Sequence, residues 1–438
     1  MSEVRRLHAP VALPADPDCS VLRDAAVDIG PAGRISYCGP MSAAPTLEEV
    51  AVTECTGILL PGLINAHAHS PMTVMRGMGG ELPLLRWLHE VIWPAEAQLR
   101  PEDIRAGMLL GSVEMLGRGV TTSVEMYFEG EQVADAVLES GGRLVLTSAI
   151  IQTPVYDWRK LLSEASAWID ADGVRFGPGD RIELGYGPHS AYTLPVEALE
   201  QIGEAARSRG ALITTHVAEA AGEDAKQREE YGSVPRLLAS HGFYGGRVLL
   251  AHAVHLSDAD IALLAGNNVS VAHCPGSNAK LASGIARLTD LRSAGIPIGL
   301  GTDGPASNDD LDLWEELQLS AMLARLSTSD AMAVTGADAL LMATRGAADS
   351  LGRTDIGALE PGRWADIVHV NVDDPAFATG LDVPDEQLIA NLVWAAGSRR
   401  VSDVWVAGEP VVADGETTRV DRRKAQAEVA AVAARLRA

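Results

Sequence analysis

The stretch Pro61–Ser70, PGLINAHAHS, ends a short apolar run with two histidines one residue apart. Alternate side chains of an extended strand point to the same face, so His67 and His69 are expected to lie side by side. Neutral imidazole is the commonest protein ligand for zinc and related ions. An isolated pair of this kind is weak evidence for a metal, because two incidental polar residues give the same pattern.

Three further segments repeat the pattern of an apolar run that ends in a histidine or an aspartate. They are TTHVAEA (residues 214–220, with His216 and Glu219), LLAHAVH (249–255, with His252) and IGLGTDG (298–304, with Asp303). Each segment alone fits a hydrogen-bonded polar group in the core. Random placement would scatter such residues over helices and loops, so four strand ends of this kind together predict a metal site.

Short apolar runs alternate with amphipathic stretches through the middle of the chain, from Gly57 to about residue 356. Helical spacing is clearest at Pro101–Leu116, Pro195–Ser208 and Leu311–Leu326. Eight βα units predict an α/β fold, a (β/α)8 TIM barrel, with its site at the carboxyl ends of the strands. The eight strand candidates are Gly57–Leu60, Thr121–Met126, Leu144–Ala149, Ile182–Gly185, Leu212–His216, Val248–His252, Val269–His273 and Ile298–Gly301.

Both ends of the chain consist of short strand-like segments punctuated by Pro, Gly and Asp. We expect residues 1–59 and 357–438 to form one small β-sandwich beside a catalytic barrel at residues 60–356. The last segment, Arg419–Ala438, has the pattern of a surface helix.

Composition excludes several classes of partner. The 438 residues carry a formal net charge of −24, and such a surface repels nucleic acid. No apolar stretch is long enough to span a membrane and no apolar signal core is present, so no membrane partner is expected. The four cysteines form no CxxC pair, which is typical of reduced thiols in a cytoplasmic protein. A barrel of this size often presents helices to a second copy, so a homodimer is compatible with the sequence.

The residue types at the four strand ends predict a reaction. Three imidazoles and the Asp303 carboxylate leave one coordination position for water, whose pKa a divalent cation lowers from about 15.7 toward about 7. Glu219 can then shuttle protons, and His252 can hydrogen-bond the hydroxide. Asp303 can also take the water's proton. The strand-like segment at residues 181–190, RIELGYGPHS, has no lysine to bridge two ions, so one metal is expected, with zinc preferred and iron or manganese also suitable.

The chain resembles the amidohydrolase superfamily over essentially its whole length. Within it, the chain is similar to the deaminases of 5'-methylthioadenosine and S-adenosylhomocysteine, with the triazine hydrolases as neighbours. The resemblance implies that His67, His69, His216 and Asp303 are metal ligands and that Glu219 and His252 are catalytic. The segments that carry it are PGLINAHAHSPMTVMRG (61–77), HVAEA (216–220), HCPGSNAKLASGIA (273–286), GTDGPASNDDLDLWEE (301–316) and ALEPGRWADIVHV (358–370).

The resemblance also implies substrate contacts. Glu96, in RWLHEVIWPAEA, matches a carboxylate that holds ribose hydroxyls, and Trp87 matches an aromatic wall of the pocket. His189 matches a contact to the purine ring. Relatives that accept S-adenosylhomocysteine bind its carboxylate with arginines after the third strand, where this chain has Ser148 at the first position and keeps only Arg159 nearby. This departure counts against a substrate that carries homocysteine.

The leading hypothesis is a hydrolytic deaminase that converts an adenosine-type nucleoside to the inosine analogue and ammonia. Adenosine, 5'-methylthioadenosine, S-adenosylhomocysteine and aminodeoxyfutalosine are the candidate substrates. The alternative is a hydrolase of a free heterocycle (a guanine-type base, a pterin or a triazine), which would have no use for a ribose-binding Glu96. A catalytically inactive scaffold is disfavoured because all six metal and catalytic residues are present. The segment HCPGSN (residues 273–278) is interpreted as a structural loop near the substrate, whose turn Ser277 and Asn278 define.

Overall fold

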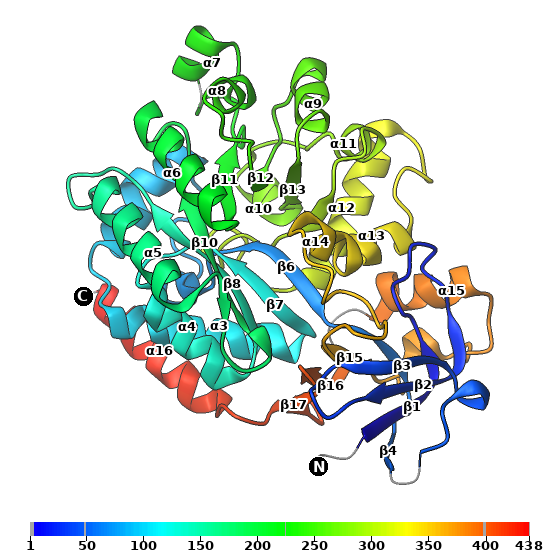
Figure 1. Cartoon of the computed structure of the whole chain (residues 1–438). Helices are drawn as coiled ribbons and strands as arrows, with labels where there is room; N and C mark the ends of the chain where they lie inside the picture. Colours follow the sequence, from blue (N-terminus) through cyan, green and yellow to red (C-terminus); the bar gives the residue numbers. More distant parts are fainter. Residues whose placement is uncertain (1–3, 48–49, 224, 397–399, 438) are drawn as a thin grey trace.

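The computed structural model describes residues 4–47, 50–223, 225–396 and 400–437, and it contains two large sheets (Figure 1). Within these ranges one sheet has eight parallel strands, joined in chain order. A parallel bridge between Ala68 and Asp303 links the first strand to the end of the last, which confirms the predicted barrel. The strands are β6 Leu63–Ala68, β7 Val120–Glu125, β8 Arg143–Ile150, β10 Ile182–Pro188, β11 Leu212–Val217, β12 Arg247–His252, β13 Val269–His273 and β14 Ile298–Leu300, and the short β9 Arg175–Phe176 pairs with β10.

The prediction for the first barrel strand was wrong. The apolar run at Gly57–Leu60 forms β5 (Ile58–Pro61), which pairs with strands of the other sheet, and the barrel begins at β6 instead. Gly62 separates the two strands, and a Cβ at this position would lie 2.0 Å from Oγ1 of Thr121. Both runs are apolar and buried, so only their pairing partners distinguish them.

The second sheet joins the two ends of the chain, as expected, and we call it the terminal sheet. Among the described residues its order is β18-β17-β16-β15-β5-β1-β2-β3, with β4 beside β1. The antiparallel pairing of β15 with β5 connects the carboxyl-terminal strands to the amino-terminal ones. The bounds are β1 Val4–Ala12, β2 Leu22–Ile29, β3 Ile35–Pro40, β4 Val50–Glu54, β15 Ile367–Val370, β16 Val401–Val406, β17 Glu409–Ala413 and β18 Glu416–Thr417.

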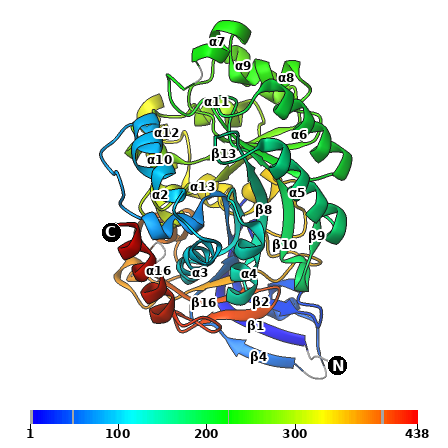
Figure 2. The same ribbon diagram turned by 90° about the vertical axis from the view of Figure 1, so that its left-hand side faces the viewer.

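Helices surround the barrel, and the three helices predicted from the sequence occur as α3, α6 and α12 within two residues of the expected bounds. Figure 2 shows the last helix, α16, lying along α3. No helix in the described ranges is long and apolar enough to cross a membrane. The bounds are α1 Leu84–Trp87, α2 Trp93–Glu96, α3 Pro101–Gly117, α4 Gly130–Ser140, α5 Trp158–Asp172, α6 Val196–Arg209, α7 Ala225–Tyr231, α8 Val234–Ser240, α9 Asp258–Ala265, α10 Pro275–Lys280, α11 Leu288–Ser293, α12 Leu313–Thr328, α13 Gly336–Met342, α14 Arg345–Ser350, α15 Asp385–Ala390 and α16 Arg422–Leu436.

A buried ion pair joins the barrel to the terminal sheet. Arg143, at the start of β8, donates from Nε to Oδ2 of Asp366 (2.8 Å) and from Nη2 to Oδ1 (3.0 Å). The same guanidinium donates to the carbonyls of Gly179 and Asp180. Both partners are almost completely buried, so the charge of each depends on the other for compensation.

Candidate metal centre and substrate pocket

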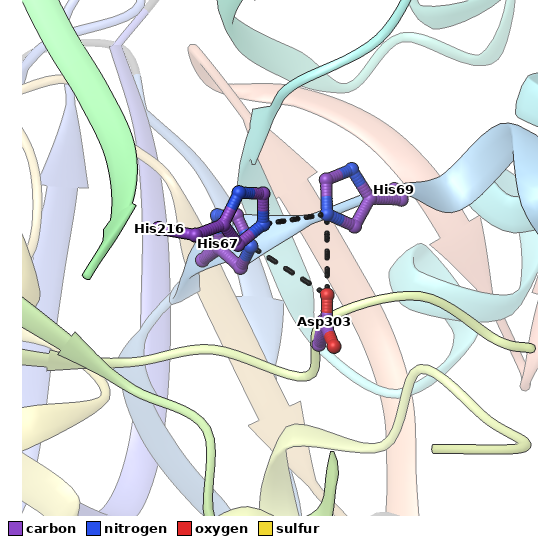
Figure 3. Close-up of side chains that lie close together, drawn as sticks. All are labelled: His67, His69, His216 and Asp303. Carbon is purple, nitrogen blue, oxygen red and sulfur yellow. Dashed lines mark hydrogen bonds and ion pairs between the residues drawn. The ribbon is translucent and has the colours of Figure 1, made fainter. Parts of the chain in front are cut away.

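Four side chains converge at the carboxyl ends of the barrel strands (Figure 3). His67 and His69 come from the end of β6, His216 from β11, and Asp303 from the loop that follows β14. One ligand atom from each of the four lies within 4.8 Å of the others. Nε2 of His69 is 3.2 Å from Oδ1 of Asp303 and 3.3 Å from Nε2 of His216, and Nε2 of His67 is 3.5 Å from the same Oδ1. The structure thus brings together the four ligands expected from the sequence.

The donor set fits a divalent metal ion. Nδ1 of His69 lies 2.7 Å from the carbonyl of Met126, and Nδ1 of His216 lies 2.7 Å from the carbonyl of His189. A carbonyl only accepts, so each Nδ1 carries the proton and each Nε2 presents a lone pair to the centre. Nε2 of His67 is buried and has no hydrogen-bond partner. Burial lowers the pKa of His67 to about 4, which keeps this imidazole in the neutral, ligating form.

Asp303 is oriented by two hydroxyl groups. Oγ of Ser277 and Oγ of Ser307 donate to its Oδ2 at 2.6 and 2.7 Å, which leaves Oδ1 facing the imidazoles. The backbone of Asp303 is left-handed (φ 60°), as is that of His252 (φ 71°). Residues other than glycine rarely adopt this conformation, and such strain is concentrated at functional sites.

Glu219 stands beside the cluster on the loop after β11. Its backbone N–H donates to Oε1 of Glu223 (2.7 Å), and the N–H of Ala220 donates to Oε2 (3.0 Å). Glu223 therefore anchors this loop, a role that no sequence motif indicated. Burial, and after it the charge of Asp303, raise the pKa of Glu219 to about 8. A carboxyl group with such a pKa can both take up and release a proton near neutral pH.

His252, at the end of β12, faces the same space. Its Nδ1 donates to Oδ1 of Asn278 (2.9 Å), while its Nε2 is buried, unpartnered, and 3.8 Å from Oε2 of Glu219. Residues 273–278 were expected to form a structural loop near the substrate, and the structure shows which side chains this loop supports. Asn278 orients His252 and Ser277 orients Asp303, so this loop supports two residues of the site.

A cavity of about 350 Å³ opens above the cluster, a size that suits a small organic molecule. His69, His216, His252, Glu219 and Asp303 line its inner end. The surrounding wall is mainly apolar and aromatic, and consists of Met72, Leu84, Trp87, Leu88, Ile92, Trp93, Glu96, Ala97, Leu99, Met126, Tyr127, Phe128, Ala149, Ile151, Thr153, Pro154, Val155, Tyr156, His189, Tyr192 and Ser307.

Three of the expected substrate contacts line this cavity. Glu96 accepts a hydrogen bond from the hydroxyl of Tyr127 (2.8 Å). Burial raises the pKa of Glu96, and the Tyr127 bond opposes that rise. Trp87 is buried against the wall and donates from Nε1 to the carbonyl of Met78 (3.0 Å). Burial lowers the pKa of His189 to about 3, so the cavity meets a neutral imidazole there.

The structure does not bring Arg159 to the cavity. This residue lies in the first turn of α5, where its Nη2 is 3.0 Å from a carboxylate oxygen of Glu197 on α6. Its guanidinium also covers the ring of Trp158. More than half of the side chain is exposed, and it is absent from the cavity wall. Arg159, the residue expected to bind a substrate carboxylate, therefore lies on the outer surface, because the start of α5 directs its side chain away from the barrel mouth.

Comparison with known proteins matches residues 58–411 to the amidohydrolase family. The chain is 38% identical over 436 residues to a 5-methylthioadenosine/S-adenosylhomocysteine deaminase of Pelotomaculum thermopropionicum, which covers 99% of this chain and 97% of that protein. An adenosine deaminase of Xanthomonas campestris with bound zinc superposes with a TM-score of 0.91 at 33% identity, over 99% of this chain and 98% of the other. The zinc complex of an Arthrobacter aurescens atrazine chlorohydrolase superposes with a TM-score of 0.87 at 25% identity, over 98% and 100%.

Proposed function

The chain belongs to the amidohydrolase family, and from that premise we propose that it is a metal-dependent hydrolytic deaminase of an adenosine-type nucleoside. Its products are the inosine analogue and ammonia. The relatives named as deaminases support this reaction. The observation that carries the substrate class is a half-buried carboxylate, Glu96, in the wall of the same cavity whose inner end holds the histidine cluster.

We propose zinc as the metal, held by His67, His69, His216 and Asp303. Three imidazoles and a carboxylate suit zinc, and two similar solved structures contain it. When bound, the ion supplies Lewis acidity and makes a water molecule nucleophilic at neutral pH.

The chain's own groups move the protons. Glu219 takes a proton from the attacking water and donates it to the ring nitrogen. The hydroxyl group newly bonded to carbon supplies a second proton, which Glu219 takes up in turn and donates to the departing amino group. The unpartnered Nε2 of His252 is available to hydrogen-bond the attacking oxygen, because Asn278 occupies its Nδ1. The neutral His189 contacts the purine, which places the amino group toward the cluster.

Glu96 recognises the ribose of the substrate. A carboxylate accepts hydrogen bonds from two neighbouring ribose hydroxyls, and a free base offers neither. A polar group dedicated to the substrate discriminates strongly against analogues that lack its partner. We therefore expect nucleosides to be preferred over free bases.

The test measures ammonia release by the metal-loaded protein from adenosine, 5'-methylthioadenosine, S-adenosylhomocysteine, aminodeoxyfutalosine, guanine and a pterin. Turnover of the nucleosides, with a sharp fall in Glu96→Gln, would support the proposal. Glu90→Gln is the matched control, since Glu90 is exposed, pairs with Arg86 and lies outside the cavity wall. Turnover of free bases alone, unaffected by Glu96→Gln, would overturn the nucleoside assignment.

A hydrolase of a free heterocycle is the second candidate, and the likeness to the atrazine chlorohydrolase favours it. The same panel, extended by a triazine, separates the two. We also propose a cytoplasmic location, because all four cysteines are free thiols and reduced thiols are typical of that compartment. A homodimer stays a prediction, which the sedimentation of the purified protein can test.

A further inference from the structure

The cavity runs from a buried end to an exposed one. His252 at the inner end is 0% exposed, whereas Val155 at the outer end is 76% exposed. Glu96 lies between these extremes in exposure. If the purine amino group faces the cluster and the ribose faces Glu96, the substituent on the ribose 5' carbon reaches the outer end. This assignment rests on the proposed nucleoside deaminase function.

The outer end is aromatic and apolar. The rings of Phe128 and Tyr156 stack in parallel, with centroids 4.5 Å apart and an interplanar angle of 4°. Ile151, Pro154 and Val155 continue this wall along the loop after β8. We call these five residues the mouth subsite. Contact of this surface with an alkyl or thioether group is favourable, because the contact removes apolar area of the protein and of the substituent from water.

No cation balances a negative charge at this end of the cavity. Among the described residues that line the cavity, none is lysine or arginine. Glu219 and Asp303 lie at the inner end, and Glu96 is the carboxyl group in the wall between that end and the mouth subsite. Burial raises the pKa of Tyr156, and the charges of Glu96 and then Glu129 raise it further. The charges of Glu96 and Glu129 therefore act on the ring of Tyr156 in the mouth subsite.

We propose that the mouth subsite selects nucleosides with a neutral, apolar 5' substituent and discriminates against those whose substituent ends in a carboxylate. A carboxylate at the mouth would lose hydration near the Glu96 carboxyl group and would find no guanidinium or ammonium group in the described cavity wall to compensate. A thioether or alkyl chain carries no charge, so it is neither repelled by carboxyl groups nor costly to dehydrate. The protein therefore discriminates between 5'-thio nucleosides with a neutral substituent and those with a carboxylate, although both have the same purine and ribose and undergo the same reaction.

The test uses a matched pair of substrates with the metal-loaded full chain. 5'-(2-Carboxyethylthio)-5'-deoxyadenosine and its methyl ester have nearly the same shape and differ in charge. We expect kcat/KM for the acid to be lower than that for the ester by about tenfold or more, from repulsion between like charges. The ester should follow 5'-methylthioadenosine closely. Equal kcat/KM for acid and ester would overturn the inference and leave the deaminase function intact.

A variant series ties the discrimination to the mouth subsite. Val155→Arg adds a cation at an exposed position and should raise the acid-to-ester ratio of kcat/KM about fivefold or more, as expected for a new charge-assisted contact. Val155→Met, a neutral side chain of similar reach, should leave that ratio near its original value, and Val155→Glu should lower it. An acid-to-ester ratio of kcat/KM that does not change with the sign of the charge at residue 155 would contradict the inference. Turnover of free bases alone by the parent protein would instead overturn the proposed function.

Discussion

The hydroxyl of Tyr127 donates a hydrogen bond to Oε1 of Glu96 across 2.8 Å inside the substrate cavity. Tyr127 is almost fully buried, so this bond is not shared with bulk water. The bond orients the Glu96 carboxylate and leaves Oε2 as its free acceptor. Tyr127 is thus a positioning residue for the group that we propose to bind the ribose.

The first prediction concerns Tyr127→Phe. Burial raises the pKa of Glu96 and the Tyr127 bond lowers it, so loss of the bond should raise that pKa further. Below its pKa, Glu96 is neutral and is a poorer acceptor for two hydroxyls. The rise in KM for adenosine on acidification should therefore begin at a higher pH in the variant than in the parent, while kcat changes little. Steady-state kinetics across pH measures this, with 2',3'-dideoxyadenosine as the control substrate. An unchanged pH profile would contradict the positioning role.

The second prediction separates metal ligands from their neighbours. His216→Ala removes an imidazole whose Nε2 faces the cluster, so bound metal should fall from about one ion per chain to well below that. His189→Ala should retain the metal, because His189 supports His216 through its backbone carbonyl, which the substitution preserves. Elemental analysis of the purified proteins gives the metal content. Equal losses in both variants would argue against the assigned ligand set.

The third prediction concerns proton transfer. Glu219→Gln keeps the shape of the side chain but cannot shuttle a proton, so kcat should fall about 10²- to 10⁴-fold with the metal retained. Glu223→Gln should have a smaller effect on kcat, because the amide oxygen still accepts one of the two backbone bonds that anchor the loop. The comparison requires kcat and metal content for both variants. A Glu223→Gln defect as large as that of Glu219→Gln would show that the loop anchor matters as much as the carboxyl group itself.

The fourth prediction concerns stability. Asp366→Ala leaves the buried guanidinium of Arg143 without a counter-ion and should lower the free energy of unfolding by about 3–5 kcal/mol. Glu90→Ala breaks an exposed pair with Arg86 and should leave the melting temperature unchanged. Thermal and denaturant unfolding of the two variants provide the measurement. Equal melting temperatures would mean that the barrel and the terminal sheet do not depend on this ion pair.

Patterns local to each strand were sufficient to predict the fold class and the metal cluster, although they placed the first barrel strand wrongly at Gly57–Leu60. In a parallel barrel the carboxyl ends of all strands open on one face, so a histidine or aspartate that closes an apolar run is directed to a common centre. His67, His216 and Asp303 could therefore be assigned without knowing which strands pair. These ligands are far apart in the sequence. They lie close together because the barrel places the carboxyl ends of its strands side by side.

Pairing between distant segments decided the features of the fold and of the site that local patterns did not predict. The apolar runs on either side of Gly62 have the same local character, and only hydrogen bonds to β1 and β15 draw β5 into the terminal sheet. Arg159 was expected in the pocket, but the start of α5 directs it toward Glu197. The bond from Tyr127 to Glu96 joins residues 31 positions apart, and that from His252 to Asn278 joins residues 26 apart. The sequence by itself determined the fold class and the metal-binding chemistry, because these depend on residue type at strand ends. Only the tertiary structure decided which side chains orient the site and which charges the pocket lacks, because those contacts arise when separate segments pack together.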